Sequence, residues 1–338
     1  MSDAQQQPTG ATGYLRKWEI KVSLTDGGTE VFSIRSFPDP NDSNDPGPGP
    51  NALRATFDIV QPGYVQFWYG DIVLYNLNTE TTEMLLRKDM SVTVSAGYEN
   101  GNYGQIFKGR LFQPFWERDN VVDFKMTLHC VIGPDKLGNN FVSFAQSAYA
   151  TQAQIIQRIV EESLHPLGNL TLPKGIKETQ FPRAQTVFGT PDEFLSWAAA
   201  DNKYGYYVDD DGLTFDDLSD DATSGNLYTY SPPSLGGQVT EAPGTIIGVP
   251  QQTQEGISFR VLLDSRLKVQ YPPDQVKIDN SSIRFLKAQI GQKISILDKD
   301  GIYKVAAVRH VGDTRGQQWY TEVHGVTNAA LLLLGYGQ

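Results

Sequence analysis

Apolar and polar residues alternate in short segments through the first third of the chain. In "WEIKVSL" (residues 18–24), every second residue from Trp18 onward is apolar. Because successive side chains of a strand point to opposite faces, this pattern predicts strands with one buried face. Roughly six to eight such strands within this length predict a compact antiparallel barrel or sandwich. The further segments of this kind are "EVFSI", "RATFDIV", "VQFWYG", "DIVLYN", "SVTVSAGY", "QIFKGRLF" and "VVDFKMTLHCVI".

Two segments interrupt this β pattern. "NTETTEMLLR" (residues 78–87) predicts a short helix, with Asn78 placed to accept the first free N–H groups. "FPDPNDSNDPGPGPN" (residues 37–51) carries five prolines and no apolar period. It predicts a long loop inserted in the first β domain rather than a domain boundary.

The pattern changes after Asp135, and a helical period follows. In "TQAQIIQRIVEESL", Thr151 and Gln154 have the spacing of a capping box, and the apolar residues fall on one stripe. In "TPDEFLSWAAADNKYG", Thr190 is the expected cap, with Pro191 at the first helical position and Gly205 as the stop. Asp-Gly at 211–212 then predicts a tight hairpin. These features predict an α/β middle domain.

A linker rich in proline and glycine, "SPPSLGGQVTEAPG", leads into a third segment with strand alternation again, as in "GISFRVLLD" and "GQKISILDKDGIYKVAAVRHVG". The predicted organisation is a flexible N-terminal tail at 1–13, a β domain at 14–140, an α/β domain at 141–238 and a second β domain at 239–338. This mainly β fold with an α+β middle domain is the fold class that the pattern favours.

The formal net charge of -11 at pH 7 argues against a protein that grips nucleic acid, because that binding draws its affinity from lysine and arginine. Simple solubility is the alternative explanation of the acidity. The single cysteine, Cys130, excludes an internal disulfide and a cysteine-based zinc site, and it is expected to be buried. The polar N-terminus and the short apolar "AALLLL" near the C-terminus predict neither a standard export signal nor a membrane anchor.

The segment "VRHVGDTRGQQWYTEVHG" (residues 308–325) gathers His310, Asp313, Arg315, Glu322 and His324. A metal held by His310, Asp313 and His324 would match no familiar ligand spacing. The favoured interpretation is a hairpin with a six-residue loop at 312–317 and solvated charges in that loop. One face of its second strand would carry Trp319, Thr321 and Val323.

Other polar clusters also lack the pattern of a catalytic or metal site. The acidic run Asp209, Asp210, Asp211, Asp216, Asp217, Asp220 and Asp221 has the wrong register for an EF-hand, which favours surface acidity. Glu117, beside Trp116 and Asp119, fixes no carboxylate pair for glycoside hydrolysis and is expected in a turn. No nucleophile elbow, phosphate loop or HExxH motif occurs. We therefore predict no catalytic, cofactor-binding or metal-binding residue.

The first and third segments share an order of features. Each has a β-branched strand, a glycine turn, an aromatic residue followed by lysine, and a strand that carries threonine and histidine near its end. Gly104, Phe107, Lys108, Thr127 and His129 correspond to Gly301, Tyr303, Lys304, Thr321 and His324. This similarity predicts a framework that occurs twice in the chain.

"IVLYNLNTETTEMLLRKDMSVTVSAGYENGNYGQIFKGRL" resembles the first barrel of the central baseplate hub proteins of contractile-tailed bacteriophages. "GTIIGVPQQTQEGISFRVLLDSRLKV" and "YKVAAVRHVGDTRGQQWYTEVHG" are similar to the last domain of the same family. The family is related to the hub part of type VI secretion spikes. The resemblance extends from about Tyr14 to Gly325, and the proline-rich loop at 37–51 departs from it.

The resemblance implies two tube-like antiparallel β-barrel domains that flank a small helix-containing domain. It implies a non-enzymatic homotrimer whose six barrels form a pseudo-sixfold ring in the virion tail baseplate. Such a ring would adapt a sixfold tail tube to a threefold central spike, and DNA would pass through its lumen without specific binding. A separate spike protein and other baseplate proteins are the expected partners.

Two other functions stay open from the sequence. One is a carbohydrate-binding or carbohydrate-degrading tail component that uses exposed aromatic residues such as Trp68, Tyr69 and Trp116. The other is a free-standing enzyme whose site the sequence does not reveal.

Overall fold

The fold is mainly β, as the alternation predicts, with three helices in the part of the chain that is described. The structure is a computed structural model. It describes residues 15–25, 29–38, 47, 53–63, 68–86, 89–132, 141–163, 169–172, 176, 180–202, 204–208, 212–217, 225–231, 246–253, 256–270, 273–279, 283 and 300–327. Most of the proline-rich loop at 37–51 and the C-terminal apolar segment lie outside these residues.

The N-terminal β segment forms one antiparallel array. Its neighbouring strands run in the order β4-β7-β6-β5-β1-β2, with β3 beside β4. Helix α1 begins after Asn78, whose Oδ1 accepts the N–H of Thr81 at 2.7 Å, as predicted. The elements are β1 (Arg16–Leu24), β2 (Glu30–Arg35), β3 (Ala55–Gln61), β4 (Tyr69–Tyr75), α1 (Thr79–Leu85), β5 (Met90–Tyr98), β6 (Tyr103–Arg118) and β7 (Phe124–Val131).

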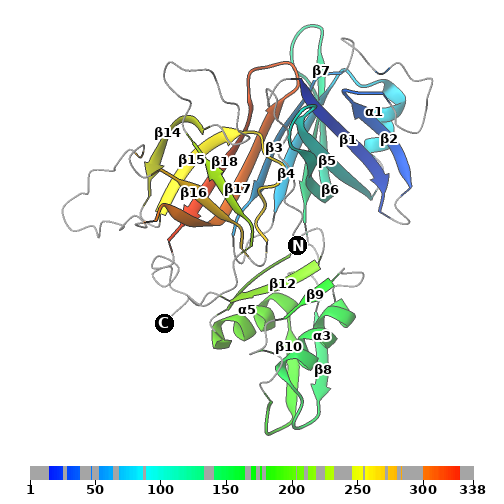
Figure 1. Ribbon diagram of the computed structural model, residues 1–338. Helices are drawn as coiled ribbons and strands as arrows, with labels where there is room; N and C mark the ends of the chain where they lie inside the picture. Colours follow the sequence, from blue (N-terminus) through cyan, green and yellow to red (C-terminus); the bar gives the residue numbers. More distant parts are fainter. Residues whose placement is uncertain are drawn as a thin grey trace, which may run out of the picture.

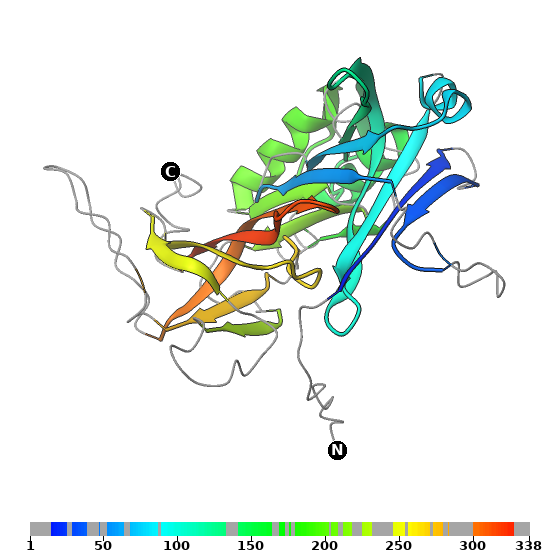
Figure 2. The ribbon, with the colours of Figure 1, turned by 90° about the horizontal axis from the view of Figure 1, so that it is seen from above.

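The C-terminal β segment continues the same sheet instead of forming a separate one. Its strands run in the order β14-β15-β18-β17, and β17 then pairs with β3 of the first segment. The result is one 13-stranded sheet with β14 towards one end and β1 and β2 towards the other (Figures 1 and 2). These strands are β13 (Leu227–Tyr230), β14 (Ile246–Gln252), β15 (Gly256–Leu262), β16 (Gln275–Ile278), β17 (Ile302–Asp313) and β18 (Trp319–Val326).

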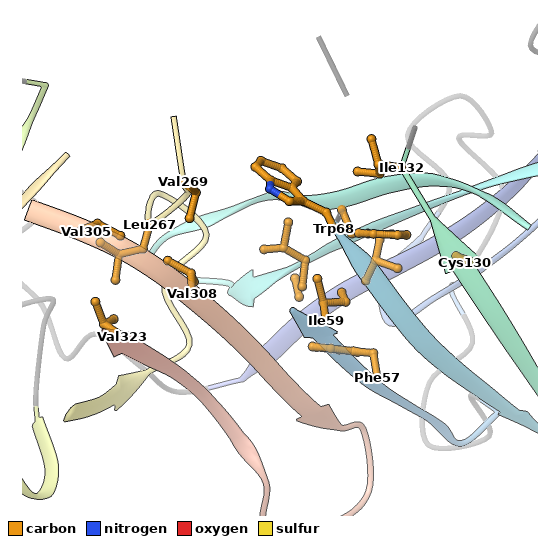
Figure 3. Packing of buried hydrophobic residues seen from close by; sticks show 14 of the residues in the cluster. Phe57, Ile59, Trp68, Cys130, Ile132, Leu267, Val269, Val305, Val308 and Val323 are labelled. Atoms are coloured by element: carbon orange, nitrogen blue, oxygen red, sulfur yellow. The ribbon is translucent and has the colours of Figure 1, made fainter. Parts of the chain in front are cut away.

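The long strand β17 makes this joint because its two ends pair with different strands. Its beginning pairs with β16, whereas residues 308–313 pair with β3. The core is continuous across the joint, and each fully buried aliphatic or aromatic side chain there stabilises the fold by about 1.5–3 kcal/mol. Figure 3 shows Phe57, Ile59, Trp68, Ile132, Val305, Val308 and Val323 in this core.

The middle segment forms a smaller helix-containing unit beside the large sheet (Figure 1). Its capping box is reciprocal, because Thr151 N–H donates to Gln154 Oε1 at 2.9 Å and Gln154 N–H donates to Thr151 Oγ1 at 3.2 Å. Gly205 is not the helix stop that the sequence predicts, since it lies in β11 and pairs with Asp216. The elements are β8 (Val142–Gln146), α3 (Gln152–Ser163), β9 (Asn169–Thr171), β10 (Gln185–Gly189), α5 (Pro191–Asn202), β11 (Tyr204–Val208) and β12 (Gly212–Asp217).

The helices of the described part are short. None is long and apolar enough to cross a membrane.

Candidate assembly surface

The two β segments contain the same arrangement of five strands. In the first, β3 pairs with β4, β4 with β7, β7 with β6, and β6 with β5. In the second, β14 pairs with β15, β15 with β18, β18 with β17, and β17 with β16. All these pairs are antiparallel, and the strands follow one another in the same order along the chain. The strand pairing therefore confirms that a framework occurs twice, although the β-branched strand that the similarity places at 291–299 of the third segment lies outside the described residues and β16 takes the corresponding place in the pairing.

Two histidines mark equivalent places in this repeat. His129 of β7 lies opposite Gln113 of β6, and His324 of β18 lies opposite Ala307 of β17. In both hairpins the ladder shifts by one residue immediately before this pair. Matched bulges at matched positions fix the alignment of β6 with β17, because a bulge sets the register of the residues beyond it.

The lysine correspondence is displaced by two residues in this alignment. Lys108 lies further from its bulge than Lys304 does, and Lys108 pairs with Thr93 of β5. Phe107 and Tyr303, which precede the lysines, are displaced in the same way. The matching aromatic-lysine pairs therefore do not occupy equivalent places.

The threonine correspondence also fails. Thr127 is half-buried on the same strand face as His129, whereas Thr321 is fully buried on the face opposite to His324. The cause is one residue of spacing, which moves a side chain to the other face of a strand.

Polar contacts fix the tip of the β17–β18 hairpin to the first β segment. Arg16 Nη1 donates to the carbonyl oxygen of Asp313 at 2.7 Å. Arg54 donates to both carboxylate oxygens of Asp313, at 3.3 and 2.7 Å. Thr314 N–H donates to the carbonyl of Ala55, and Ala55 N–H donates to Thr314 Oγ1, each at 2.9 Å. The joint between the segments therefore includes side chains as well as the β ladder.

Asp313 is part of this joint and not the solvated loop charge that the sequence predicts. Burial opposes ionisation of its carboxyl, but hydrogen bonds from Arg54 and from the N–H of Arg315 outweigh burial and lower its pKa. The same hydrogen bond raises the pKa of Arg54. The side chain of Asp313 is 12% exposed, so this ion pair is better shielded from water than a typical surface pair.

A row of charged side chains crosses the outer face of the sheet at the joint. Arg309 of β17 donates to Asp58 of β3 at 2.7 and 2.6 Å and to Glu322 of β18 at 3.2 Å. Glu322 also accepts from Arg260 of β15. The hydrogen bonds to Asp58 raise the pKa of Arg309. Each half-exposed pair contributes about 0.2–1 kcal/mol, so the row specifies alignment more than it stabilises.

The structure does not bring the polar residues of 308–325 together into one site. His310 is fully buried, with Nδ1 2.9 Å from Thr321 Oγ1, and burial lowers its pKa to about 4. His324 is exposed on the other face, and Glu322 belongs to the charged row. No group of three or more histidine, cysteine or acidic residues suited to a metal ion occurs within the described ranges.

The acidic run of the middle segment falls mainly outside the described residues. This applies to Asp209, Asp210, Asp211, Asp220 and Asp221. Asp216 and Asp217 belong to β12, but their side chains are not described.

The aromatic residues considered for carbohydrate binding do not share a surface. Trp68 is 2% exposed and lies in the core. Tyr69 lies opposite Val131, whereas Trp116 lies opposite Met126, and positions five apart on β7 point to opposite faces. No aromatic platform is formed by these three side chains.

Glu117 lies in β6, which continues to Arg118, and not in the turn that the sequence predicts. Its carboxylate is 3.1 Å from Lys125 Nζ, and Asp119 lies 3.4 Å from the same nitrogen. The hydrogen bond to Glu117 raises the pKa of Lys125. The carboxylates of Glu117 and Asp119 thus both form ion pairs with the ammonium group of Lys125.

Cys130 is buried as predicted, and burial raises the pKa of its thiol, which makes it unreactive.

Sequence reasoning missed the exposed second half of β6. Phe112 is 66% exposed, Phe115 44% and Trp116 52%. The signal was available in "FQPFW", where adjacent aromatic residues must point to both faces of one strand. These exposed apolar side chains lie on both faces of β6, so a partner that covers them must approach along the edge or the end of the strand.

Comparisons with known proteins agree with the fold. No family model matches the sequence, and no curated protein matches it. A tail protein from Neisseria meningitidis MC58 has a TM-score of 0.53 at 11% identity, over 93% of this chain and 98% of that one. The 43 kDa tail protein of prophage MuSo2 from Shewanella oneidensis gives 0.53 at 10% identity, with 93% and 98% covered. A chain of the lidded Francisella PdpA-VgrG complex gives 0.51 at 8% identity, over 95% of this chain and 54% of that one. The chain therefore has the fold of phage tail proteins, as its sequence resemblance predicts.

Proposed function

We propose that this protein is a structural hub of a phage tail baseplate. Three copies form a pseudo-sixfold ring that joins a sixfold tail tube to a threefold central spike and leaves a channel for DNA. The observation that carries the proposal is the five-strand repeat, because a trimer of a twofold repeat presents six similar units. The fold shared with tail proteins supports the same assignment.

The hub acts without catalysis in this proposal. The residues that could have formed a metal or catalytic site make structural contacts instead. His310 lies in the core, Asp313 in the joint and Glu322 in the charged row. The function requires a closed ring that binds the tail tube on one side and the spike on the other. It also requires a lumen that does not bind the phosphate groups of DNA. The formal charge of -11 suits such a lumen.

Native mass spectrometry of the purified full chain tests the assembly state. We expect a homotrimer, alone or together with a tube or spike protein. An image of assembled tails should place the chain on the tail axis, between tube and spike. A persistent monomer that hydrolyses polysaccharide, and that lies off the axis, would contradict the proposal in favour of the carbohydrate-degrading alternative.

A further inference from the structure

We propose that the second half of β6 in one copy pairs with β14 of the next copy, and that this contact closes the ring. The inference rests on the proposed trimer and names its interface. Its template lies inside the chain, where β17 pairs with β3. By the five-strand repeat, β6 is the counterpart of β17 and β14 is the counterpart of β3.

The edge of β6 is paired only along its first half. β5 covers β6 from Tyr103 to Arg110, and no strand of the described part covers the same edge over residues 111–118. In β17 the equivalent half is the part that pairs with β3. The second half of β6 therefore has a free edge among the described strands, whereas the equivalent edge of β17 is already paired with β3 of the same chain.

β14 offers the complementary edge. β15 pairs with one side of it, and no described strand pairs with the other side over residues 247–251. Ile247 is 41% exposed and Val249 60%. β3, the counterpart of β14, has β4 on one side and β17 on the other.

Burial shows what the pairing would cover. His310 of β17 is fully buried in the joint, whereas its counterpart in β6, Trp116, is 52% exposed. Val308 is 1% exposed, and its counterpart Pro114 is only half-buried. In the joint, Gln61 and Ile59 of β3 lie beside Val308 and His310, whereas no strand of the described part lies beside Pro114 and Trp116 on the corresponding edge of β6.

The repeat also predicts a register. Val311 lies opposite Asp58 in the joint, and their counterparts are Glu117 and Gln251. Glu117 of one copy should therefore lie opposite Gln251 of the next. The irregularity of β14 between Ile247 and Gln251 shortens the ladder, so apolar side chains make up much of the contact.

The two edges suit head-to-tail assembly. In Figure 1 the β6–β7 hairpin projects at the top of the molecule, away from β14 at the left end of the sheet. A contact between two different surfaces propagates from copy to copy and forms a ring when the rotation closes. With three copies, the ring contains three strand contacts within chains and three between chains, and the two kinds alternate.

Disulfide trapping tests this contact. Directly opposed residues of antiparallel strands have Cα atoms about 4.5–5.5 Å apart, which a disulfide can bridge. The full chain carrying Glu117→Cys and Gln251→Cys should give covalent trimers on a non-reducing gel after mild oxidation. The matched control is Lys108→Cys with Gln251→Cys, because β5 already occupies the edge at Lys108. This control and the single variants should remain uncross-linked.

The outcomes separate this contact from the proposed function. Native trimers that never form the 117–251 disulfide would overturn the contact and leave the hub assignment standing, as would a disulfide within one chain. Open-ended covalent polymers would support the strand contact but contradict a closed trimer. If the purified chain is monomeric, the same cross-link is sought in assembled tails, where its absence refutes the contact.

A second variant checks the apolar part of the contact. Trp116→Asp should abolish the trimer while lowering the unfolding midpoint of the chain only slightly, because the half-exposed side chain loses within its own chain only its stacking on Phe124. Phe188→Asp is the matched control: Phe188 of β10 is 67% exposed, and its replacement should leave the trimer intact. Equal trimer levels in the two variants would contradict the role of Trp116.

Discussion

His310 illustrates how a residue that suggests chemistry in the sequence can serve packing in the fold. It belongs to a buried network in which Thr321 Oγ1 also accepts the N–H of Asp264 at 3.0 Å. The Asp264 carboxylate accepts the Tyr230 hydroxyl at 3.0 Å and forms an ion pair with Arg266. Burial lowers the pKa of His310 to about 4, against the opposing effects of Asp264 and the Leu267 carbonyl. The ring therefore stays neutral at physiological pH.

This shift predicts a pH dependence of stability. The folded-state pKa of about 4 lies below the ordinary value of 6.5, so the contribution is complete above pH 6.5 and is lost as pH falls towards 4. It amounts to about 3 kcal/mol. Urea unfolding of His310→Asn between pH 4 and 7 should show a smaller decline in unfolding free energy than the natural chain. Phe57→Leu, a core change without a titratable group, should keep the natural slope. Identical slopes for the natural chain and His310→Asn would refute the assignment.

At the scale of elements, β17 determines how the two β segments meet. Its close approach to β3 depends on Gly312, because a Cβ there would lie 2.2 Å from Cζ of Phe57. Phe57 in turn packs edge-to-face on Trp319, with ring centroids 5.3 Å apart. Position 312 thus requires glycine, because the ring of Phe57 from β3 occupies the space that a Cβ would need.

Gly312→Val should therefore weaken the joint. We expect a loss of about 1–3 kcal/mol, as for other overpacked cores. Faster hydrogen exchange along β3 and residues 308–313 would locate the effect. Ala307→Val is the matched control on the same strand, because Ala307 is not fully buried and should tolerate the larger side chain with little change. Equal exchange rates in the two variants would show that Phe57 does not constrain this position.

At the scale of the whole molecule, charge and repeat have separate consequences. In the proposed assembly, the repeat would supply the geometry of the ring, and the excess of acidic residues would repel phosphate groups. If the lumen of the proposed ring carries few lysine and arginine side chains, a DNA backbone in it would release few counterions and would therefore bind only weakly.

The assembled protein should accordingly fail to retard duplex DNA in a gel at about 0.15 M salt. Lysine substitution of acids that face the lumen should introduce retardation and slow genome ejection. Retardation by the unsubstituted protein at this salt concentration, or ejection that is unchanged by the lysines, would contradict a repulsive lumen.

The sequence by itself determined the strands, the helix starts and the existence of a repeat. Those features depend on local spacing: side-chain alternation in β1, the Thr151 capping box in α3, and the order of strands around His129 and His324. Local spacing did not reveal that Asp313 is shielded in an ion pair with Arg54, that Trp68 is buried, or that Lys108 and Lys304 are out of register. The tertiary structure decided these because each depends on residues distant in the chain, above all on the pairing of β17 with β3. The pairing of strand edges and the positions of bulges determine which residues of distant strands contact one another. Neither can be recognised from the period of apolar residues in the sequence.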